Sequence, residues 1–404
     1  MVFTVVVFAI VYLGMMMGSL PGLRVDRAAI ALLGAIAILA AGELPRDEAL
    51  ASIDFGTLGL LFGLMIVSAN FNLSGLYSAL AHEVRGMDMG PQAFLGVVVA
   101  VVGIMSALLT NDVIAVALAP VLLEVCISRR LNPVPFLLAL SFSANAGSIA
   151  TIIGSPQNML IGEHFHLSFA SFMGYTAVPA VSSLVVIWAI LVLQYRNDWS
   201  LQGDVQPSDE SQRSLDVWEA SKGSVVTIAL VLVFLIAPWP RSLVALTAGG
   251  VLLANAHFKS QSMLDRVDWQ LLILFLGLFI VNGALQATGL PHEMIVRLRD
   301  SGIELQDPSW IFLSTVVLSD VVSNVPSVML LLPFATEPIS APLMAIASGL
   351  SSNLLIIGSL ASIIVVDAAA RRGMIISSRA FMRSGVPVTV LSLGVSVLWL
   401  WWLV

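Results

Sequence analysis

The sequence predicts an all-α polytopic membrane protein built as an inverted repeat, and three observations predict this fold class. The chain of 404 residues is 58% hydrophobic and only 11% charged, whereas a soluble domain carries roughly 25% charged residues. Apolar runs of about 20 residues recur along its whole length, each long enough to cross a hydrocarbon layer about 30 Å thick. Three pairs of similar segments also follow one another in the same order in the two halves.

The predicted elements follow the apolar runs. The N-terminus has neither the basic segment nor the small-residue cleavage site of a signal peptide, so we interpret it as a retained first span. We expect about ten transmembrane helices, two of them interrupted, and two re-entrant helical hairpins. The helices are 2–20, 28–42, 55–71, 134–165 (interrupted), 170–194, 223–237, 242–256, 269–286, 341–368 (interrupted) and 380–403, and the hairpins are 93–127 and 309–337.

Each predicted hairpin carries a polar motif near its middle. Residues 109–120 read LTNDVIAVALAP, and residues 322–333 read VSNVPSVMLLLP. Each motif places an Asn in an apolar surround, with a Pro nine residues further on. The apolar stretches that contain them, 93–127 and 309–337, are broken near the middle by these motifs, so they fit helical hairpins that enter and leave on one side.

Direct comparison of the two halves reveals the repeat. The segments DFGTLGLLFGLMIVSANFNLSGL and DWQLLILFLGLFIVNGALQATGL align without a gap at an offset of 214. The hairpin motifs align at an offset of 213, which pairs Asn111 with Asn324. GSIATIIGSPQN and SSNLLIIGSLAS align at an offset of 204, which pairs Gly154 with Gly358. Because an odd number of crossings separates the units, the second is inverted, an arrangement that indicates a secondary transporter with its site near the midplane.

The repeat predicts how the chain is organised. The divisions are N-terminal scaffold helices in 1–45, a first repeat in 46–195, a polar connector in 196–222 and a second, inverted repeat in 223–404.

The basic residues predict the orientation, because cytoplasmic loops carry an excess of Lys and Arg. With the Arg24/Arg27 loop in the cytoplasm, 14 basic residues fall in cytoplasmic loops and 4 in outer loops, which accounts for all 18. Both termini are then outside, and the expected location is a bacterial-type inner (plasma) membrane, in contact with lipid. The net charge of −7 says little about partners, because most charged groups are in short loops. No nucleic-acid partner is expected.

The interrupted helices carry the candidate binding residues. A broken helix in hydrocarbon is tolerated only where protein or a water-filled cavity surrounds it. Its N-terminal N–H groups favour anions, whereas its C-terminal carbonyls, with Asn, Ser and Thr oxygens, favour Na⁺ or a similar hard cation. A lone polar residue in a span is usually only an interhelical hydrogen-bonding group, but the matched motifs favour a site. The candidates are Ser106, Thr110, Asn111, Asp112, Asn145, Thr151, Gly154, Ser155, Asn158, Ser319, Ser323, Asn324, Asn353, Gly358 and Ser359.

Asp112 is the most informative single residue. A carboxylate within a membrane segment costs at least about 2.5–3.5 kcal/mol on insertion scales and is a functional candidate by default. It could bind a cation or carry a proton, or it could lie in a tip that reaches water and be solvated. Asp320 is not its repeat mate, because the same offset pairs Asp320 with Ala107. The expected site is therefore asymmetric in charge.

At these motifs the chain resembles the ion transporter superfamily, most closely its arsenite-pump and NhaD-type permeases, which are related to divalent-anion/sodium symporters. LTNDVIAVALAP, NAGSIATIIGSPQNMLIG, VVSNVPSVMLLLP and GSLASIIVVDAAARRG carry the resemblance, which covers nearly the whole chain. It implies a homodimer in which a mobile part moves against a fixed scaffold, as an elevator. It also implies a Na⁺ site at Ser106, Thr110, Asn111 and Gly154, and a second or degenerate site at Ser319, Ser323, Asn324 and Gly358.

The sequence therefore predicts a secondary active transporter of a small inorganic ion or oxyacid, with no catalytic residues and no cofactor. Arsenite export coupled to H⁺ or Na⁺ is the leading interpretation. A Na⁺-coupled dicarboxylate or sulfate importer is the alternative, although an acid at the first tip would repel a dianion. Two other classes stay open: an ion channel, and an intramembrane aspartyl protease that uses Asp112 and Asp320.

Overall fold

The protein is described by a computed structural model, which covers residues 1–18, 25–77, 79, 83, 89–200, 215–291, 293, 297, 304 and 306–403. Within these ranges the chain is helical and contains no β-strand beyond one isolated bridge between Leu131 and Ser200. The predicted all-α fold is confirmed. Residues 201–214 of the predicted connector lie outside the described residues. So do Arg24, Arg85, Arg213 and Arg299, which entered the charge count.

Most uninterrupted helices correspond to predicted spans. They are α1 (Val2–Met17), α2 (Arg27–Ala40), α4 (Phe55–Leu73), α10 (Phe169–Tyr195), α11 (Val217–Ile236), α12 (Arg241–Leu253), α14 (Trp269–Ala287) and α20 (Ser378–Leu403). Two short helices, α3 (Arg46–Ser52) and α13 (Ser260–Leu264), were not predicted.

The hairpins and broken helices lie where the motifs predict them. The first hairpin is α6 (Pro91–Leu108) and α7 (Asn111–Ser128), and the second is α16 (Pro308–Val322), α17 (Asn324–Leu331) and η2 (Leu332–Phe334). The broken helices are α8 (Pro133–Ser148), η1 (Ile152–Gly154) and α9 (Pro156–His164), and α18 (Ser340–Ser351), η3 (Ile356–Gly358) and α19 (Leu360–Arg371).

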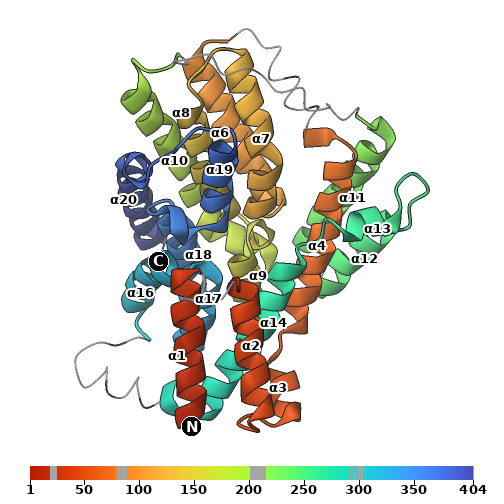
Figure 1. The fold of residues 1–404 in the computed structure, drawn as a ribbon, viewed down its shortest axis with the longest axis vertical. Helices are drawn as coiled ribbons and strands as arrows, with labels where there is room; N and C mark the ends of the chain where they lie inside the picture. Colours follow the sequence, from red (N-terminus) through yellow and green to blue (C-terminus); the bar gives the residue numbers. More distant parts are fainter. Residues whose placement is uncertain are drawn as a thin grey trace.

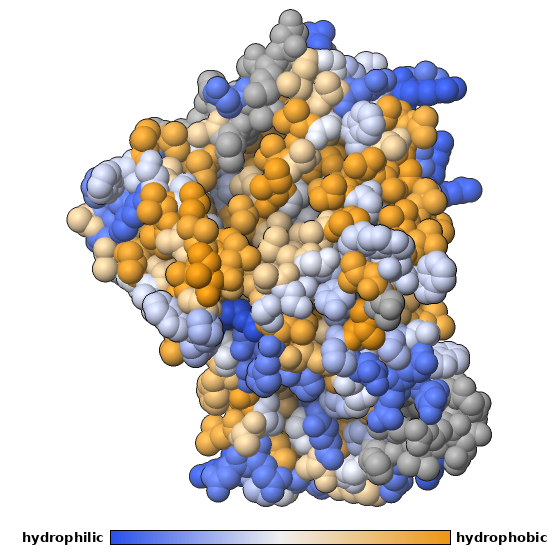
Figure 2. Space-filling model, turned by 180° about the vertical axis from the view of Figure 1, so that it is seen from behind, coloured by the Kyte–Doolittle hydropathy of each residue, from blue (hydrophilic) through white to orange (hydrophobic). Residues whose placement is uncertain are grey.

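Seven of the described helices are long and apolar enough to cross a membrane: α4, α6, α7, α10, α11, α14 and α20. Of these, α6 and α7 form the first hairpin; the predicted crossings use the others together with the shorter apolar helices α1, α2 and α12 and the two broken helices. Large apolar side chains are exposed along many of these elements, for example on α10, α11 and α20. Figure 2 shows apolar residues over much of one face, with hydrophilic patches towards its ends. Such a surface suits contact with lipid.

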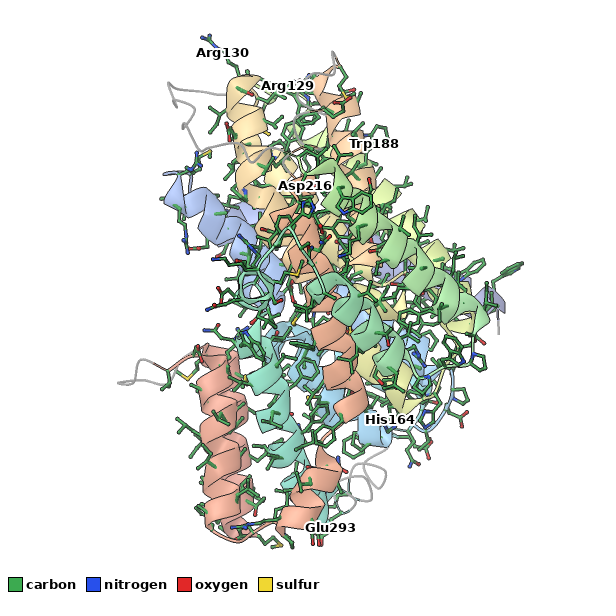
Figure 3. The ribbon with its side chains drawn as sticks, turned by 90° about the vertical axis from the view of Figure 1, so that its right-hand side faces the viewer. Arg129, Arg130, His164, Trp188, Asp216 and Glu293 are labelled. Carbon is green, nitrogen blue, oxygen red and sulfur yellow. The ribbon has the colours of Figure 1, made fainter. Side chains whose placement is uncertain are left out.

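The first hairpin returns to the side from which it enters. Its ends meet where the guanidinium of Arg129, after α7, donates to the carbonyl of Met89, before α6, at 2.6 Å. Arg129 and Arg130 lie at one end of the molecule, and Glu293 lies at the other (Figure 3).

The two broken helices run in opposite directions. In Figure 1, α9 lies below α8, whereas α19 lies above α18. The first hairpin occupies the upper part of the molecule and the second hairpin a lower part (Figure 1). The motifs paired in the sequence therefore enter from opposite ends, as an inverted repeat requires.

Two glycines at equivalent repeat positions, Gly63 and Gly277, allow close packing of the helices beside these hairpins. Gly63 of α4 packs on the backbone of Ala245 in α12, and its mate Gly277 of α14 packs on the backbone of Ala31 in α2. A Cβ at either glycine would collide with main-chain atoms, which cannot rotate away. The two glycines therefore fix two close helix pairs, α4 with α12 and α14 with α2.

Helix α11 begins at Val217, inside the segment predicted as the connector 196–222. The Asp216 carboxylate caps it by accepting from the backbone N–H of Glu219 at 3.1 Å. The buried Glu219 accepts in turn from the amides of Asn70 and Asn255, at 3.2 and 2.6 Å. The polar residues at 216–219 therefore belong to the first turn of α11, where their side chains are hydrogen-bonded. Their polar composition had suggested a connector instead.

We predict that Gly63→Ala destabilises the protein by about 1–3 kcal/mol, the usual cost of overpacking a close contact. The control is Gly250→Ala in the neighbouring α12, where a Cβ has no neighbour within 4 Å. Thermal unfolding of the purified protein measures both. The control should melt at or slightly above wild type, because an unstrained Gly→Ala change stabilises a helix. Equal melting of the two variants would contradict the close packing at Gly63.

Candidate substrate and ion site

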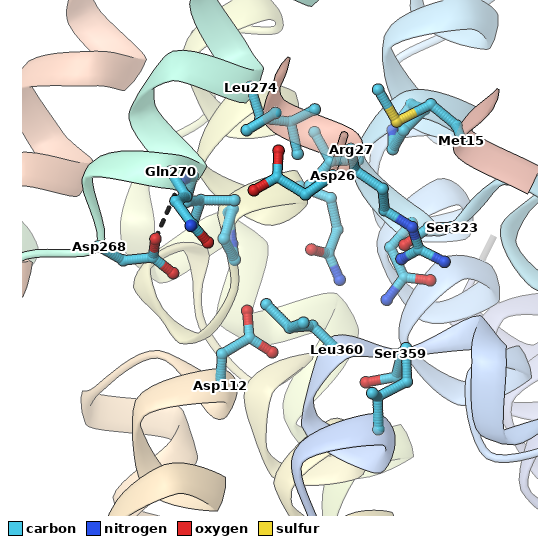
Figure 4. A pocket seen from close by; sticks show the side chains of 18 of the residues that line it. Met15, Asp26, Arg27, Asp112, Asp268, Gln270, Leu274, Ser323, Ser359 and Leu360 are labelled. Atoms are coloured by element: carbon cyan, nitrogen blue, oxygen red, sulfur yellow. Dashed lines mark hydrogen bonds between the residues drawn. The ribbon is translucent and has the colours of Figure 1, made fainter. Parts of the chain in front are cut away.

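A cavity of about 350 Å³ lies between the two hairpin tips, the two helix breaks and the ends of α1, α2 and α14. Figure 4 shows this arrangement, with Asp112 and Ser359 on one side and Asp26, Arg27 and Asp268 on the other. Both tips therefore open into one space, although their motifs are separated by 213 residues in the chain.

Four helices begin at this cavity without a side-chain cap: α7, α9, α17 and α19. The first residues of each helix, or its N-cap, line the cavity. The first N–H groups of a helix have no internal partner and carry the positive end of its dipole. The cavity therefore has an excess of hydrogen-bond donors and a positive field from the backbone, both of which favour anions and acceptor oxygens.

Charged side chains modify this field. Asp26 and Asp268 cap their own helices, accepting from the N–H groups of Ala29 at 2.8 Å and Leu271 at 3.0 Å. The Asp112 carboxylate lies within range of the backbone N–H of Ala361, in the first turn of α19, and experiences the charge of Asp268. Among the described residues that line the cavity, Arg27 is the only Lys or Arg. Acceptor groups and donor groups thus face the same space.

A network of amides holds the first tip against both breaks. Asn111 donates to Oδ1 of Asn145 at 3.1 Å, and Ser359 donates to the same oxygen at 2.9 Å. Asn145 donates onward to Oδ1 of Asn353 at 3.0 Å. Asn145 thereby connects the first tip, the first broken helix and the second broken helix.

The second tip is held to its own break. In the amide orientation that gives both side-chain atoms a partner, Asn324 bonds to the hydroxyl of Ser352 at 2.8 Å. In this orientation it also donates to the carbonyl of Gly358 at 3.2 Å. Ser323, just before it, has φ 79° and ψ 160°, a conformation open almost only to glycine. The corresponding Thr110 has φ −67°. The second tip is therefore the strained one.

Buried oxygens without hydrogen-bond partners gather at the first tip and break. They are Oγ of Ser106, Oδ1 of Asn111, Oγ of Ser155 and Oδ1 of Asn158. A Cβ at Gly154 would collide with the carbonyl oxygens of Ser148 and Ser106, so only glycine fits here. Oxygens without donors are suitable ligands for a hard cation.

Five of the sequence-predicted residues line the cavity. They are Asn111, Asp112, Ser323, Asn324 and Ser359. Asn145 and Asn353 lie behind them in the amide network. The remaining candidates are buried around the tips and breaks without lining the cavity: Ser106, Thr110, Thr151, Gly154, Ser155, Asn158, Ser319 and Gly358.

Sequence reasoning missed the residues that the scaffold side contributes: Asp26, Arg27, Asp268 and Gln270. The sequence comparison identified Asp268 as the repeat mate of Asp54. Both residues are helix N-caps, and this capping role explains an Asp at these positions without any role in a binding site. Arg27 entered only the charge count. No spacing in the sequence relates these positions to the tips.

A second cavity, of about 550 Å³, lies further along α14 and is lined by residues including Asp54, Glu163 and Asn282. The Tyr12 hydroxyl donates to Oδ1 of Asn282 at 3.0 Å and to the carbonyl of Pro326 at 3.3 Å. Since Pro326 lines the first cavity and Asn282 the second, Tyr12 lies on the barrier between them.

Inverted halves, paired hairpins and broken helices around a polar cavity define a secondary transporter. A family model described as "Citrate transporter" (CitMHS) matches residues 10–342, and the chain belongs to this family. It is thus an integral membrane transporter of small anions, and the resemblance to the ion transporter superfamily is confirmed.

Relatives agree with this assignment. The chain is 30% identical over 408 residues to an uncharacterized transporter of Mycobacterium tuberculosis, covering 94% of each chain. It is 27% identical over 439 residues to a silicon efflux transporter of Oryza sativa subsp. japonica, covering 91% of this chain and 90% of the relative. The solved YdaH transporter of Alcanivorax borkumensis has a similar fold, with a TM-score of 0.59, 15% identity and coverage of 99% and 96%.

The aspartyl protease alternative is wrong, since the family and the relatives are transporters. Its two proposed acids also do not share one space, because Asp112 lines the cavity and Asp320 does not.

We predict that Asn145→Ala destabilises the protein, because Asn111, Asn353 and Ser359 each lose a buried hydrogen-bond partner. Leaving one buried polar group unsatisfied costs about 1–3 kcal/mol. Thermal unfolding of the purified protein should show a clear fall in melting temperature. Ser182→Ala is the control, since that hydroxyl only bonds within its own helix. A melting temperature for Asn145→Ala equal to that of the control would show that the amide network contributes nothing.

Proposed function

We propose that the protein exports a small inorganic oxyacid, with arsenite as the leading substrate, in exchange for H⁺ or Na⁺. One observation supports this above the others: the cavity combines four uncapped helix N-termini with three carboxylates. A hydroxylated, weakly ionised acid presents hydroxyl donors as well as acceptor oxygens, so it can satisfy both kinds of group. The similarity to a silicon efflux transporter supports the same class of substrate.

A fully ionised polycarboxylate suits the cavity less well. It offers acceptor oxygens only, and it would place several negative charges next to Asp26, Asp112 and Asp268. Like charges at such distances repel strongly where water is scarce. A second candidate nevertheless has support: a Na⁺-coupled dicarboxylate or sulfate importer is favoured by the family description and by Arg27 in the cavity.

The coupling cation is proposed to bind at the first tip. The unpartnered oxygens of Ser106, Asn111, Ser155 and Asn158 lie beside the Gly154 break, and they carry no charge of their own. This set overlaps the predicted site of Ser106, Thr110, Asn111 and Gly154. Bound Na⁺ would be coordinated by these oxygens and by nearby backbone carbonyl oxygens, and it would hold the tip against the break.

We further propose that the hairpins and broken helices move together against α1, α2, α4, α12 and α14, in a homodimer in the inner membrane with both termini outside. The two cavities lie along α14 on either side of the Tyr12 barrier, which supports alternating exposure of one site to the two sides. Movement of the tips along α14 would carry a bound substrate past this barrier.

A thermal-stability screen of the purified protein tests the substrate class. Arsenite, antimonite, silicate, sulfate, succinate and citrate are each compared, with and without Na⁺, at two pH values. Stabilisation is expected with the oxyacids, because a ligand that binds only the folded state raises its stability. Na⁺-dependent stabilisation by citrate or succinate, with none by arsenite or silicate, would overturn the proposal in favour of the importer.

We predict that Asp112→Asn abolishes pH-gradient-driven arsenite flux in reconstituted vesicles, because the Asn side chain cannot bind and release a proton. Glu124→Gln is the matched control on the same helix, α7, since Glu124 does not line the cavity. Flux through the control should match wild type. Full proton-coupled flux through Asp112→Asn would remove the proposed role of this carboxylate.

A further inference from the structure

The scaffold presents the same pair of charges at both cavities. Arg27 is the first residue of α2 and Arg241 the first residue of α12, and the offset of 214 makes them repeat mates. Asp268 and Asp54, mates at the same offset, cap α14 and α4. Arg27 and Asp268 line the first cavity. Asp54 lines the second cavity, together with Glu163, the ion-pair partner of Arg241.

The packing of the scaffold helices supports this alignment. Gly63 of α4 packs on the backbone of Ala245 in α12, and Gly277 of α14 packs on the backbone of Ala31 in α2. Ala31 and Ala245 are themselves 214 residues apart. The two helix pairs are therefore built alike, and the start of α2 at one cavity is equivalent to the start of α12 at the other.

At the second cavity, Arg241 binds the first broken helix. Its guanidinium donates to the carbonyls of Gly162 and Leu167, at 3.3 and 2.7 Å. It also lies 3.4 Å from the carboxylate of Glu163, and the two side chains are only 15% and 22% exposed. A Cβ at Gly56, in the first turn of α4, would lie 3.4 Å from Oε2 of Glu163. These contacts hold the end of α9 against the scaffold.

At the first cavity, the equivalent contact is not made. The offset of 204 that aligns the two breaks pairs Glu163 with Asp367 of α19. Asp367 is 55% exposed and forms an ion pair with Arg371 of its own helix at 2.8 Å. The guanidinium of Arg27 forms no hydrogen bond or ion pair with any described residue. Both charges of a second ion pair are thus present, but they do not meet in this structure.

The helix packing has the same asymmetry. Helix α9 packs closely on α4, and α17 of the second tip packs closely on α14. The equivalent pairs, α19 with α14 and α7 with α4, are not among the close helix contacts of the described residues. In Figure 1, α19 lies above the upper ends of α1 and α2. The hairpins and broken helices therefore contact the scaffold through one of two equivalent sets of contacts, as expected for one state of an alternating inverted repeat.

We propose that Glu163–Arg241 and Asp367–Arg27 are two ion pairs that form alternately and hold the moving helices at either end of their path. The first pair is formed here. When α9 and α19 move along the scaffold, this pair breaks and the second pair forms, and α19 then covers the first cavity. An exposed ion pair such as Asp367–Arg371 contributes little to stability, so Asp367 exchanges its partner easily. The inference rests on the movement proposed above.

Thiol labelling tests the proposal without any transported substrate. A reporter cysteine replaces Leu274, which lines the first cavity on α14, in a Cys126→Ser background that removes the single native thiol. Glu163→Gln weakens the pair that is formed here, so a larger share of molecules should adopt the other state. The reporter should then react severalfold more slowly with a maleimide. Adding Asp367→Asn to Glu163→Gln should restore faster labelling, because it weakens the opposing pair.

The control for labelling is Glu48→Gln on α3, an exposed acid that lines neither cavity. Its reporter should react at the wild-type rate. A reporter rate unaffected by Glu163→Gln would overturn the proposal, and so would a double variant that labels no faster than Glu163→Gln alone.

Cross-linking tests the second ion pair directly. Arg27→Cys and Asp367→Cys are combined in the Cys126→Ser background and treated with a bifunctional thiol reagent about as long as an Arg side chain. A cross-link is expected, and its yield should rise severalfold when Glu163→Gln is added. Arg27→Cys with Ala369→Cys is the control and should not cross-link, because Ala369 is buried in α19. Two reactive cysteines at 27 and 367 that never cross-link would refute the second pair.

These results are independent of the substrate. If wild type moves no arsenite in vesicles, the proposed function fails, whereas labelling and cross-linking still decide the ion pairs. If arsenite is transported and no cross-link forms, the ion pairs fail and the substrate assignment stands. Should Glu163→Gln not fold, the cross-link in the wild-type background decides, since neither Arg27 nor Asp367 is buried.

Discussion

The structure depends on one constraint: polar backbone at a helix break must find partners inside a membrane protein. The amide of Asn158 meets this constraint at the first break, where it donates to the carbonyls of Ser148 and Thr151, both at 3.0 Å. At the centre of the molecule the amide of Asn145 bonds to Asn111, Asn353 and Ser359. Asn145 and Asn353 are not repeat mates, because the offset of 204 pairs them with Gly349 and Ile149. The two halves are therefore tied together by residues that break their symmetry.

The same asymmetry continues outward from this centre. The first tip has neutral oxygens without partners, a normal backbone at Thr110 and a break covered by buried Ile152 and Ile153. The second tip has satisfied hydroxyls and a strained Ser323. An inverted repeat supplies two equivalent scaffolds, and the side chains at matched positions make the two tips chemically different.

The elements were predictable from sequence because each has a strong local cause. Apolar runs fix the helices, and Gly-Ser-Pro at 154–156 and the matched Asn motifs fix the breaks and tips. The cavity was predictable in part, since inverted motifs must meet. The sequence did not predict that Asp26, Arg27 and Asp268 line the cavity. Their place there depends on the position of the hairpin tips along the scaffold helices, which the sequence does not specify. A helix cap and a lining residue have the same sequence signature.

The closeness of the two cavities has a mechanical consequence. On α14 the first cavity ends at Leu274 and the second begins at Phe279. With a rise of 1.5 Å per residue, these positions are about 7.5 Å apart along the helix axis. The barrier is thus thin compared with a hydrocarbon layer of about 30 Å. If the tips move along α14 as proposed, a slide of one to two helical turns would carry a bound substrate from the first cavity past this barrier to the second.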